Sequence, residues 1–454
     1  MRRISTGNRD ADLILNGGFP VNSINVIMGQ PGSGKTIFVE QLAFANLCKE
    51  RPVLYLTTIS EPLPKVLTYL QEFSFAKEEA VGSEIIYESI ADAVTEGPQH
   101  LPERVFELLQ TYRPAIIVFD SFKAIGDLMP DLVTWRKVLY ELAGSLSAYD
   151  TTTFWIGEYI ADMVPRLPEF AVADSIVELT REQHGKREAR YFRVAKLRGS
   201  GFLGGSHAFE ISASGLCVYP RLITPRRTGS YATTEERLQT GVKGLDAMVE
   251  TGWLRSTSTL VIGPPGSGKT IVGLHFLREG VQLGETALLA SFQENPSQLR
   301  RIVRNLGWDP DQLLVTGGLE HLYTSPVELQ IDSIIGRLFR RVEEVGAKRV
   351  VIDSLDDLLS AAQDEQRYRD YIYALTQRFS ELGITAMLTV EASRNNLSPA
   401  DVSPLVDNVL QLEMLMGEAL ERTIRVVKSR GSAHDGRRCQ LRITSEGAVV
   451  GEPR

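Results

Sequence analysis

The stretch that decides the fold is GQPGSGKT at residues 29–36, and it returns as GPPGSGKT at residues 263–270. An apolar run, NVIM or TLVI, precedes each stretch, and a run typical of a helix, IFVEQLAFANL or IVGLHFLREG, follows it. A strand, a glycine-rich loop and a helix in this order are typical of a P-loop, whose backbone N–H groups and helix N-terminus bind phosphate oxygens. We therefore predict two nucleotide-binding loops in one chain.

Each position of the loop has an expected role in binding ATP. The glycines allow backbone N–H groups to converge on the phosphates, and the lysine ammonium is expected to reach the β- and γ-phosphates. The threonine hydroxyl is expected to bind Mg²⁺. The predicted nucleotide-binding residues are Gly29, Gly32, Ser33, Gly34, Lys35 and Thr36 in the first loop and Gly263, Gly266, Ser267, Gly268, Lys269 and Thr270 in the second.

The two loops belong to an internal duplication. Lys269 follows Lys35 by 234 residues, and Asp353, at the end of RVVID, follows Asp120, at the end of AIIVFD, by 233. The sequence KLRGS at residues 196–200 returns as KSRGS 232 residues further on. Landmarks in one order at an almost constant offset indicate two copies of one domain. We predict a first domain over residues 1–224, a linker rich in Pro, Gly, Ser, Thr and charge over 225–237, and a second domain over 238–454.

The pattern between these landmarks alternates. Short β-branched runs such as PVLYLTT, AIIVFD and TTFWIGE are typical of buried strands, and the spacing of Leu299, Ile302, Val303 and Leu306 is typical of a helix. Strands that alternate with helices predict an α/β fold, with a mostly parallel sheet covered by helices on both faces. Near the end of each copy, closely spaced strand candidates such as YFRVAKL and TIRVVKS predict an antiparallel extension.

Carboxylates at the ends of predicted strands are the candidate metal and catalytic groups. Asp120 and Asp353 each end a buried strand, where ligands of parallel sheets bind, so we expect them to hold Mg²⁺ through its water. Hydrolysis also needs a group that orients or deprotonates water, and we assign this role to Glu61 in TTISEP and Glu294 in SFQENP. Aligning the following prolines would pair Glu294 with Ser60; we prefer Glu61, because core packing fixes the helix that follows.

Two basic pairs, Lys196 with Arg198 and Lys428 with Arg430, lie far along the chain from their own loops. Period two along a strand places both charges of a pair on one face. We expect these pairs to act as trans fingers, which reach the γ-phosphate bound by a neighbouring subunit. A solvated edge strand would show the same pattern without that role.

Together these features resemble the KaiC family of RecA-like ATPases. The matching marks are the paired P-loops, the openings TGNRDADL and TGVKGLDA, the Asp-Ser at each strand end, and the closing KLRGS and KSRGS. The resemblance covers nearly the whole chain and implies tandem RecA-like domains. It also implies a double-ring homohexamer with ATP at subunit interfaces, where one subunit's P-loop meets its neighbour's Lys-x-Arg pair.

The resemblance also implies a possible kinase activity, because the second domain of the family's clock member phosphorylates its own Ser and Thr residues. The equivalent serine falls on Ser403 in ADVSPLVDN, and Pro404 stands where the family has a threonine. We therefore expect at most single-site autophosphorylation on Ser403. The family's paired glutamates are reduced to one carboxylate in each copy, Glu61 and Glu294.

Composition ranks the alternative functions lower. The 454 residues include 49 Lys and Arg against 57 Asp and Glu, a net charge of −8. Nucleic-acid binding is not indicated, because it needs clustered basic groups, and the best cluster, Arg226 with Arg227, falls in the linker. A RecA-like DNA-remodelling ATPase, and a scaffold in which ATP only holds subunits together, stay as alternatives.

The cysteines, the N-terminus and the length of the apolar runs indicate the cellular compartment. Its three cysteines lie far apart, its N-terminus is not typical of a secretory signal, and no apolar run approaches the ~18 residues that span a bilayer. We expect a cytoplasmic protein without a membrane segment. We also expect a signalling partner that reads the nucleotide or phosphate state, which the sequence does not identify.

Overall fold

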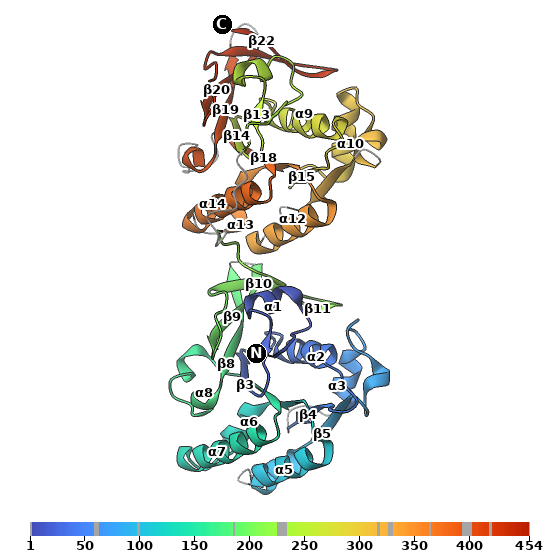
Figure 1. Ribbon diagram of the computed structural model, residues 1–454, viewed down its shortest axis with the longest axis vertical. Helices are drawn as coiled ribbons and strands as arrows, with labels where there is room; N and C mark the ends of the chain where they lie inside the picture. The colour runs from blue at the N-terminus through green and yellow to red at the C-terminus, as the bar shows by residue number, and fades with distance from the viewer. Residues whose placement is uncertain are drawn as a thin grey trace. The chain divides into compact units, whose positions relative to one another are not determined.

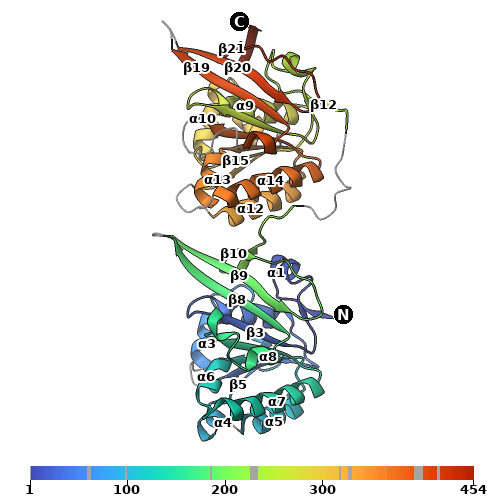
Figure 2. The same ribbon diagram turned by 90° about the vertical axis from the view of Figure 1, so that its left-hand side faces the viewer.

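The computed structural model describes residues 2–58, 63–97, 100–184, 187–224, 234–315, 318–325, 330–362, 365–392, 402–416 and 420–453. Among the predicted site residues, Glu61 lies outside these ranges, as does most of the predicted linker. The chain divides into two compact units, Met1–Arg221 and Leu222–Arg454. Each unit is described by itself below (Figures 1 and 2).

The first unit alternates strands and helices up to β8 and then continues as strands. Its elements are β1 (Arg3–Ile4), α1 (Arg9–Ile14), β2 (Phe19–Pro20), β3 (Ile24–Gly29), α2 (Lys35–Ala45), β4 (Val53–Thr57), α3 (Leu63–Leu70), β5 (Ile85–Ser89), α4 (Ala91–Glu96), α5 (Leu101–Tyr112), β6 (Ile116–Asp120), α6 (Phe122–Asp127), α7 (Leu132–Ala148), β7 (Thr152–Gly157), α8 (Glu169–Val172), β8 (Ser175–His184), β9 (Arg187–Leu197), β10 (Ser206–Ser212) and β11 (Gly215–Tyr219).

The second unit repeats this order of strands. Its elements are β12 (Arg237–Leu238), β13 (Trp253–Leu254), β14 (Ser258–Gly263), α9 (Lys269–Gln282), β15 (Ala287–Ser291), α10 (Pro296–Asn305), α11 (Pro310–Leu314), β16 (Leu319–Tyr323), α12 (Ile331–Val345), β17 (Arg349–Asp353), α13 (Leu355–Ala362), α14 (Glu365–Glu381), β18 (Thr385–Glu391), β19 (Asn408–Met416), β20 (Leu420–Ser429), β21 (Cys439–Thr444) and β22 (Gly447–Pro453).

Each unit has one large sheet, which in the described residues contains nine strands. The order is β5-β4-β6-β7-β3-β8-β9-β10-β11 in the first unit and β16-β15-β17-β18-β14-β19-β20-β21-β22 in the second. Pairing is parallel from β5 to β8 and from β16 to β19, and antiparallel beyond them. The predicted mostly parallel sheet with an antiparallel extension is confirmed in both units.

Helices cover both faces of each sheet because the central strands are apolar on both sides. In β3, Ile27 packs into one core with α1 and α2, whereas Val26 and Met28 pack into the other core with α5 and α7. In the second unit, α9 and α10 cover one face, and α12, α13 and α14 cover the other. This burial leaves the strand ends and the loops after them as the places for polar chemistry.

A stack of aromatic rings supports the end of β6, where Asp120 lies. Phe122 is fully buried, and its ring lies parallel to that of Trp155, with 4.1 Å between the ring centroids. Phe122 also contacts Trp135 from α7, at 5.4 Å between centroids. The stack therefore fixes the chain two residues after the predicted metal-binding aspartate.

Replacing Phe122 with alanine should destabilise the first unit by about 3–5 kcal/mol, because it removes a buried ring and leaves a cavity. Urea unfolding followed by hydrogen exchange of peptides from residues 1–221 would measure this separately from the second unit. Leu132→Ala is the control: its side chain is 52% exposed, and its loss should change stability by less than about 0.5 kcal/mol. Equal effects of the two variants would contradict the structural role of the stack.

Candidate functional site

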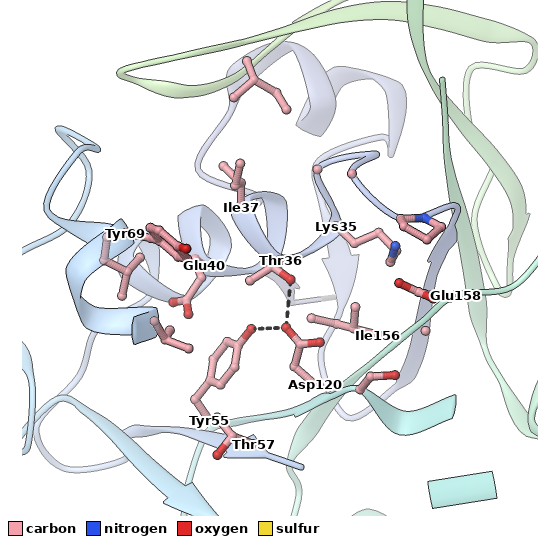
Figure 3. A pocket seen from close by; sticks show the side chains of 18 of the residues that line it. Lys35, Thr36, Ile37, Glu40, Tyr55, Thr57, Tyr69, Asp120, Ile156 and Glu158 are labelled. Atoms are coloured by element: carbon pink, nitrogen blue, oxygen red, sulfur yellow. Dashed lines mark hydrogen bonds between the residues drawn. The ribbon is translucent and has the colours of Figure 1, made fainter. Parts of the chain in front are cut away.

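A cavity of about 790 Å³ opens in the first unit beside the loop that joins β3 to α2. Figure 3 shows side chains from the loop, α2 and the ends of several parallel strands arranged around it. Its polar lining includes Lys35, Thr36, Glu40, Tyr55, Asp120 and Glu158. These residues come from distant parts of the sequence, and the strand order brings them together.

The loops of both units take the conformation that their glycines allow. Gly34 and Gly268 precede the first helical residue with φ of 94° and 107°, a region that favours glycine. At Gly29, an added Cβ would lie 2.1 Å from the carbonyl oxygen of Leu179. Ser33 and Ser267 are buried, and their hydroxyls have no partner among the described residues. A side chain at Gly29 would therefore collide with the neighbouring strand, and both loops keep the glycine conformation that a P-loop requires; phosphate binding by these residues stays a prediction.

The two loop lysines are oriented in the same way. Lys35 Nζ donates to the carbonyl oxygens of Gly29 and Gln30 at 3.0 and 2.9 Å. Lys269 Nζ donates to those of Gly263 and Pro264 at 2.8 and 3.1 Å. Each ammonium group is thus held against the backbone carbonyl oxygens of the first two residues of its loop.

Burial lowers the pKa of Lys35, whereas the nearby carboxylates of Glu158 and Asp120 raise it. The second unit has the same balance, with burial lowering the pKa of Lys269 while Asp353 and Glu391 raise it. A partly desolvated ammonium group attracts an anion more strongly than a fully hydrated one does, since water screens it less.

Each helix that follows a loop is tied to a strand end by one hydrogen bond. Thr36 Oγ1 donates to Asp120 Oδ2 at 2.9 Å, and Thr270 Oγ1 donates to Asp353 Oδ2 at 2.6 Å. The predicted metal ligands therefore meet in both units.

The second partner of the aspartate differs between the units. Tyr55 from β4 donates its hydroxyl to Asp120 Oδ2 at 2.9 Å, whereas Thr389 from β18 donates to Asp353 Oδ1. The strand registers place Leu289 at the position of Tyr55, and Ile156 at the position of Thr389. The two units hold the same carboxylate from opposite neighbouring strands.

The donor set fits Mg²⁺, which takes oxygen ligands and binds through one or two carboxylates together with substrate phosphates. Each unit offers one hydroxyl and one carboxylate in contact beside its predicted phosphate-binding loop. The described residues contain no group of three or more His, Cys, Asp or Glu that would form an all-protein cage. Such an arrangement suits a metal that arrives with the nucleotide.

Of the two residues predicted to orient water, the structure describes only Glu294, in the second unit. Glu294 lies half-buried after β15, where Ser291 Oγ donates to its carbonyl oxygen at 3.0 Å. Burial, and then the nearby carboxylate of Asp353, the predicted metal ligand, raise the pKa of Glu294. Glu61 lies outside the described residues, so its role stays a prediction.

The basic pairs contact their own unit rather than their own loop. Lys196 Nζ donates to the carbonyl oxygen of Phe170 at 3.3 Å, and Arg198 pairs with Asp174 at 3.2 Å. Neither Lys196 nor Arg198 is among the described residues that line the first cavity.

The second unit repeats this arrangement at Ser403. Lys428 Nζ donates to the carbonyl oxygens of Ser403 and Val406 at 2.8 and 2.7 Å, and Arg430 lies 3.6 Å from Asp407. The side chains of Arg198 and Arg430 are 61% and 60% exposed. Both arginines can therefore reach a neighbouring molecule.

Several polar residues of the site escaped the sequence analysis. Glu158 directly follows β7, and Glu391 is the last residue of β18; the two are 233 residues apart, the same offset as the two aspartates, a signal that could have found them. Glu40 stands inside the apolar helix run IFVEQLAF, which was also visible. For Tyr55 and Thr389 no comparable signal existed, because a polar side chain within a strand run is common.

Two P-loops at the strand ends of two α/β units define a tandem P-loop ATPase fold. A family model for the KaiC ATPase matches the chain twice, over residues 4–223 and 238–454. The chain therefore belongs to the KaiC ATPase family, and its units are RecA-like domains in tandem.

Curated relatives agree over nearly the full chain. A circadian clock oscillator protein KaiC of Rippkaea orientalis is 25% identical over 99% of this chain and 89% of its own length. KaiC 1 of Synechocystis sp. is 24% identical, and KaiC of Thermostichus vulcanus 26%, with the same coverage. None of the helices in the described part of the chain has the length and apolar character needed to cross a membrane.

Each aspartate accepts a second hydrogen bond from a different residue, and removing that bond should lower activity only in the unit that contains it. We expect Tyr55→Phe to lower phosphate release at the first site, and Thr389→Val at the second, each by about tenfold, because such outer partners orient a metal-binding carboxylate. Phosphate release should be measured with the other unit's loop disabled by Lys269→Ala or Lys35→Ala. Unchanged rates would show that the threonine contact alone orients the carboxylate.

Proposed function

We propose that the protein binds ATP with Mg²⁺ in both domains and hydrolyses it, as a homohexameric double ring with ATP at subunit interfaces. The proposed domains span residues 1–224 and 238–454, joined by a linker at 225–237. The supporting observation is the same set of three residues in each unit: a loop lysine, buried in the first unit and half-buried in the second, and a threonine that donates to a strand-end aspartate.

Different residues of the chain are proposed to bind the phosphates, hold the metal ion and activate the attacking water. The loop N–H groups and Lys35 or Lys269 bind the phosphates and balance their charge, and the N-terminus of α2 or α9 adds its dipole. Thr36 with Asp120, and Thr270 with Asp353, would hold Mg²⁺. When bound, this ion neutralises charge on the β- and γ-phosphates. Glu294, and Glu61 in the first domain, would accept a proton from the attacking water or orient it.

The basic pairs, whose arginines are exposed, complete each site from the neighbouring subunit. Arg198 and Arg430 directly follow β9 and β20 of the antiparallel extension, and their lysine partners bind backbone carbonyl oxygens of α8 and of the Ser403–Leu405 turn. A guanidinium at the γ-phosphate stabilises charge that develops as the phosphoryl group leaves. A ring built from one repeated interface supplies such a group to every site.

Phosphate release measured with Mg-ATP should fall in both Lys35→Ala and Lys269→Ala and be abolished in the double variant. Arg198→Ala in the Lys269→Ala background should lower the rate at least about 100-fold, because trans arginines supply 10³–10⁵ in related NTPases. Sedimentation with nucleotide would verify that each variant still assembles.

Mixing separates action in trans from action in cis. Subunits with Lys35→Ala and subunits with Arg198→Ala, both with Lys269→Ala, should be nearly inactive alone. Equal mixing should restore about one quarter of the first-site activity, because that share of interfaces combines an intact loop with an intact arginine. No recovery from co-assembled rings would contradict the trans assignment.

We further propose that the second domain transfers phosphate to Ser403. Ser403 lies half-buried in a single 3₁₀ turn, Ser403–Leu405, and its carbonyl oxygen is bound by Lys428, the partner of the proposed arginine finger. The serine therefore stands where a neighbour's γ-phosphate would arrive if Lys428 and Arg430 act in trans.

The intact mass after incubation with Mg-ATP tests this transfer. We expect one added phosphoryl group in the wild type and none in Ser403→Ala, while both release phosphate. An unchanged wild-type mass together with released phosphate would leave an ATPase without autokinase activity and contradict the proposal for Ser403.

A further inference from the structure

Glu40 is a buried carboxyl group with an unsatisfied oxygen that lines the first cavity. Its side chain belongs to α2, and the residue is 1% exposed. Tyr87 from β5 donates to Oε2 at 2.9 Å, whereas Oε1 has no hydrogen-bond partner among the described residues. Buried polar atoms in native proteins are almost always paired, so an exception at a ligand cavity calls for an explanation.

Glu40 lies close to the proposed metal ligands. It follows Thr36 by four residues on one helix, which places the two side chains on the same face with roughly 5–6 Å between Cβ atoms. Figure 3 shows Glu40, Thr36, Tyr55 and Asp120 around one part of the cavity. Burial, and to a smaller extent the carboxylate of Asp120, raise the pKa of Glu40 to about 8 although the Tyr87 bond lowers it.

The second unit shows that the fold does not need this carboxyl group. The position five residues after the loop lysine is Leu274 there, which is fully buried. The strand registers also replace Tyr87 with His321 and Tyr55 with Leu289. A carboxyl group with one unpaired oxygen is destabilising where leucine packs well, so Glu40 is better explained by a ligand than by folding.

We propose that Glu40 is an outer-sphere residue of the first domain's divalent-cation site, whose Oε1 accepts a hydrogen bond from a water molecule of the hydrated Mg²⁺. This proposal rests on the proposed nucleotide and Mg²⁺ site at Lys35, Thr36 and Asp120. Mg²⁺ keeps several of its waters when it binds proteins, and those waters are strong donors that need acceptors. The proposal makes the first site more acidic around the cation than the second, where Leu274 offers no acceptor.

Manganese binding measures this interaction without relying on catalysis. The full chain with Lys269→Ala, which disables the second loop, would be titrated with Mn²⁺ in the presence of ADP, and free Mn²⁺ followed by its electron paramagnetic resonance signal. Glu40→Leu should weaken Mn²⁺ binding at least about tenfold, the range found when outer-sphere partners of a metal are removed. Glu40→Gln keeps an acceptor but cannot become negatively charged beside the cation, so its dissociation constant should lie between those of the wild type and Glu40→Leu.

Controls separate this role from packing and from general charge. Glu72→Gln removes an exposed carboxylate at the rim of the same cavity and should leave the Mn²⁺ dissociation constant unchanged. Thermal unfolding without nucleotide should show Glu40→Leu at least as stable as the parent, since leucine occupies this position in the second unit. A weakened metal site in a stable variant supports the proposal.

Two results would overturn it. If Glu40→Leu binds Mn²⁺ with ADP as tightly as the parent, Glu40 plays no part in cation binding, and the nucleotide site itself stands. If the parent binds no Mn²⁺ with ADP, the proposed Mg²⁺ site of the first domain fails as well. Should Glu40→Leu not fold, Glu40→Gln decides alone, and a parental dissociation constant then counts against the proposal.

Discussion

One hydrogen bond, formed in each unit between a threonine at the start of a helix and an aspartate at the end of a strand, organises the site. It joins Thr36 to Asp120 and Thr270 to Asp353 at 2.9 and 2.6 Å. The strands β3 and β6 are separated by β7, so this contact spans the centre of the parallel sheet. The apolar cores on both faces fix the strands, and a loop lysine near the same carboxylate completes the polar group in each unit. Everything proposed about phosphate and cation chemistry depends on this contact.

The two domains share this frame and differ in what surrounds it. In the first, Tyr55, Tyr87 and Glu40 bring polar groups from β4, β5 and α2 toward Asp120. In the second, leucines occupy two of these three positions, and Thr389 supports Asp353 from the other side. Both copies keep the loop, its lysine and the strand-end aspartate, but the residues that surround the aspartate differ. The two proposed nucleotide sites can therefore differ in their affinity for a cation. The asymmetry lies in buried residues, where a polar group is destabilising unless it has a partner.

The antiparallel extension carries the basic pairs that we propose to act between subunits. Its lysines bind backbone carbonyl oxygens of their own unit, and its arginines remain largely exposed beside Asp174 and Asp407. This arrangement suits a basic group that serves a neighbouring subunit, because a side chain anchored away from its own cavity can still face the next one. Lys428 also binds the backbone of Ser403, so the proposed finger and the proposed phosphorylation site share one local structure.

The sequence by itself determined the duplication, the two loops and the α/β class with its antiparallel extension. It also identified Asp120 and Asp353 as equivalent positions of the two copies. These features are local or periodic: glycine requirements, apolar runs and a constant offset are written in the order of residues. Only the tertiary structure decided which strands adjoin, and therefore that Tyr55 supports one aspartate and Thr389 the other. It also showed that Glu40, which looks like one charge in an apolar helix, is buried at the cavity with an oxygen unpaired. Such relations depend on strand order and side-chain burial, which sequence spacing does not specify.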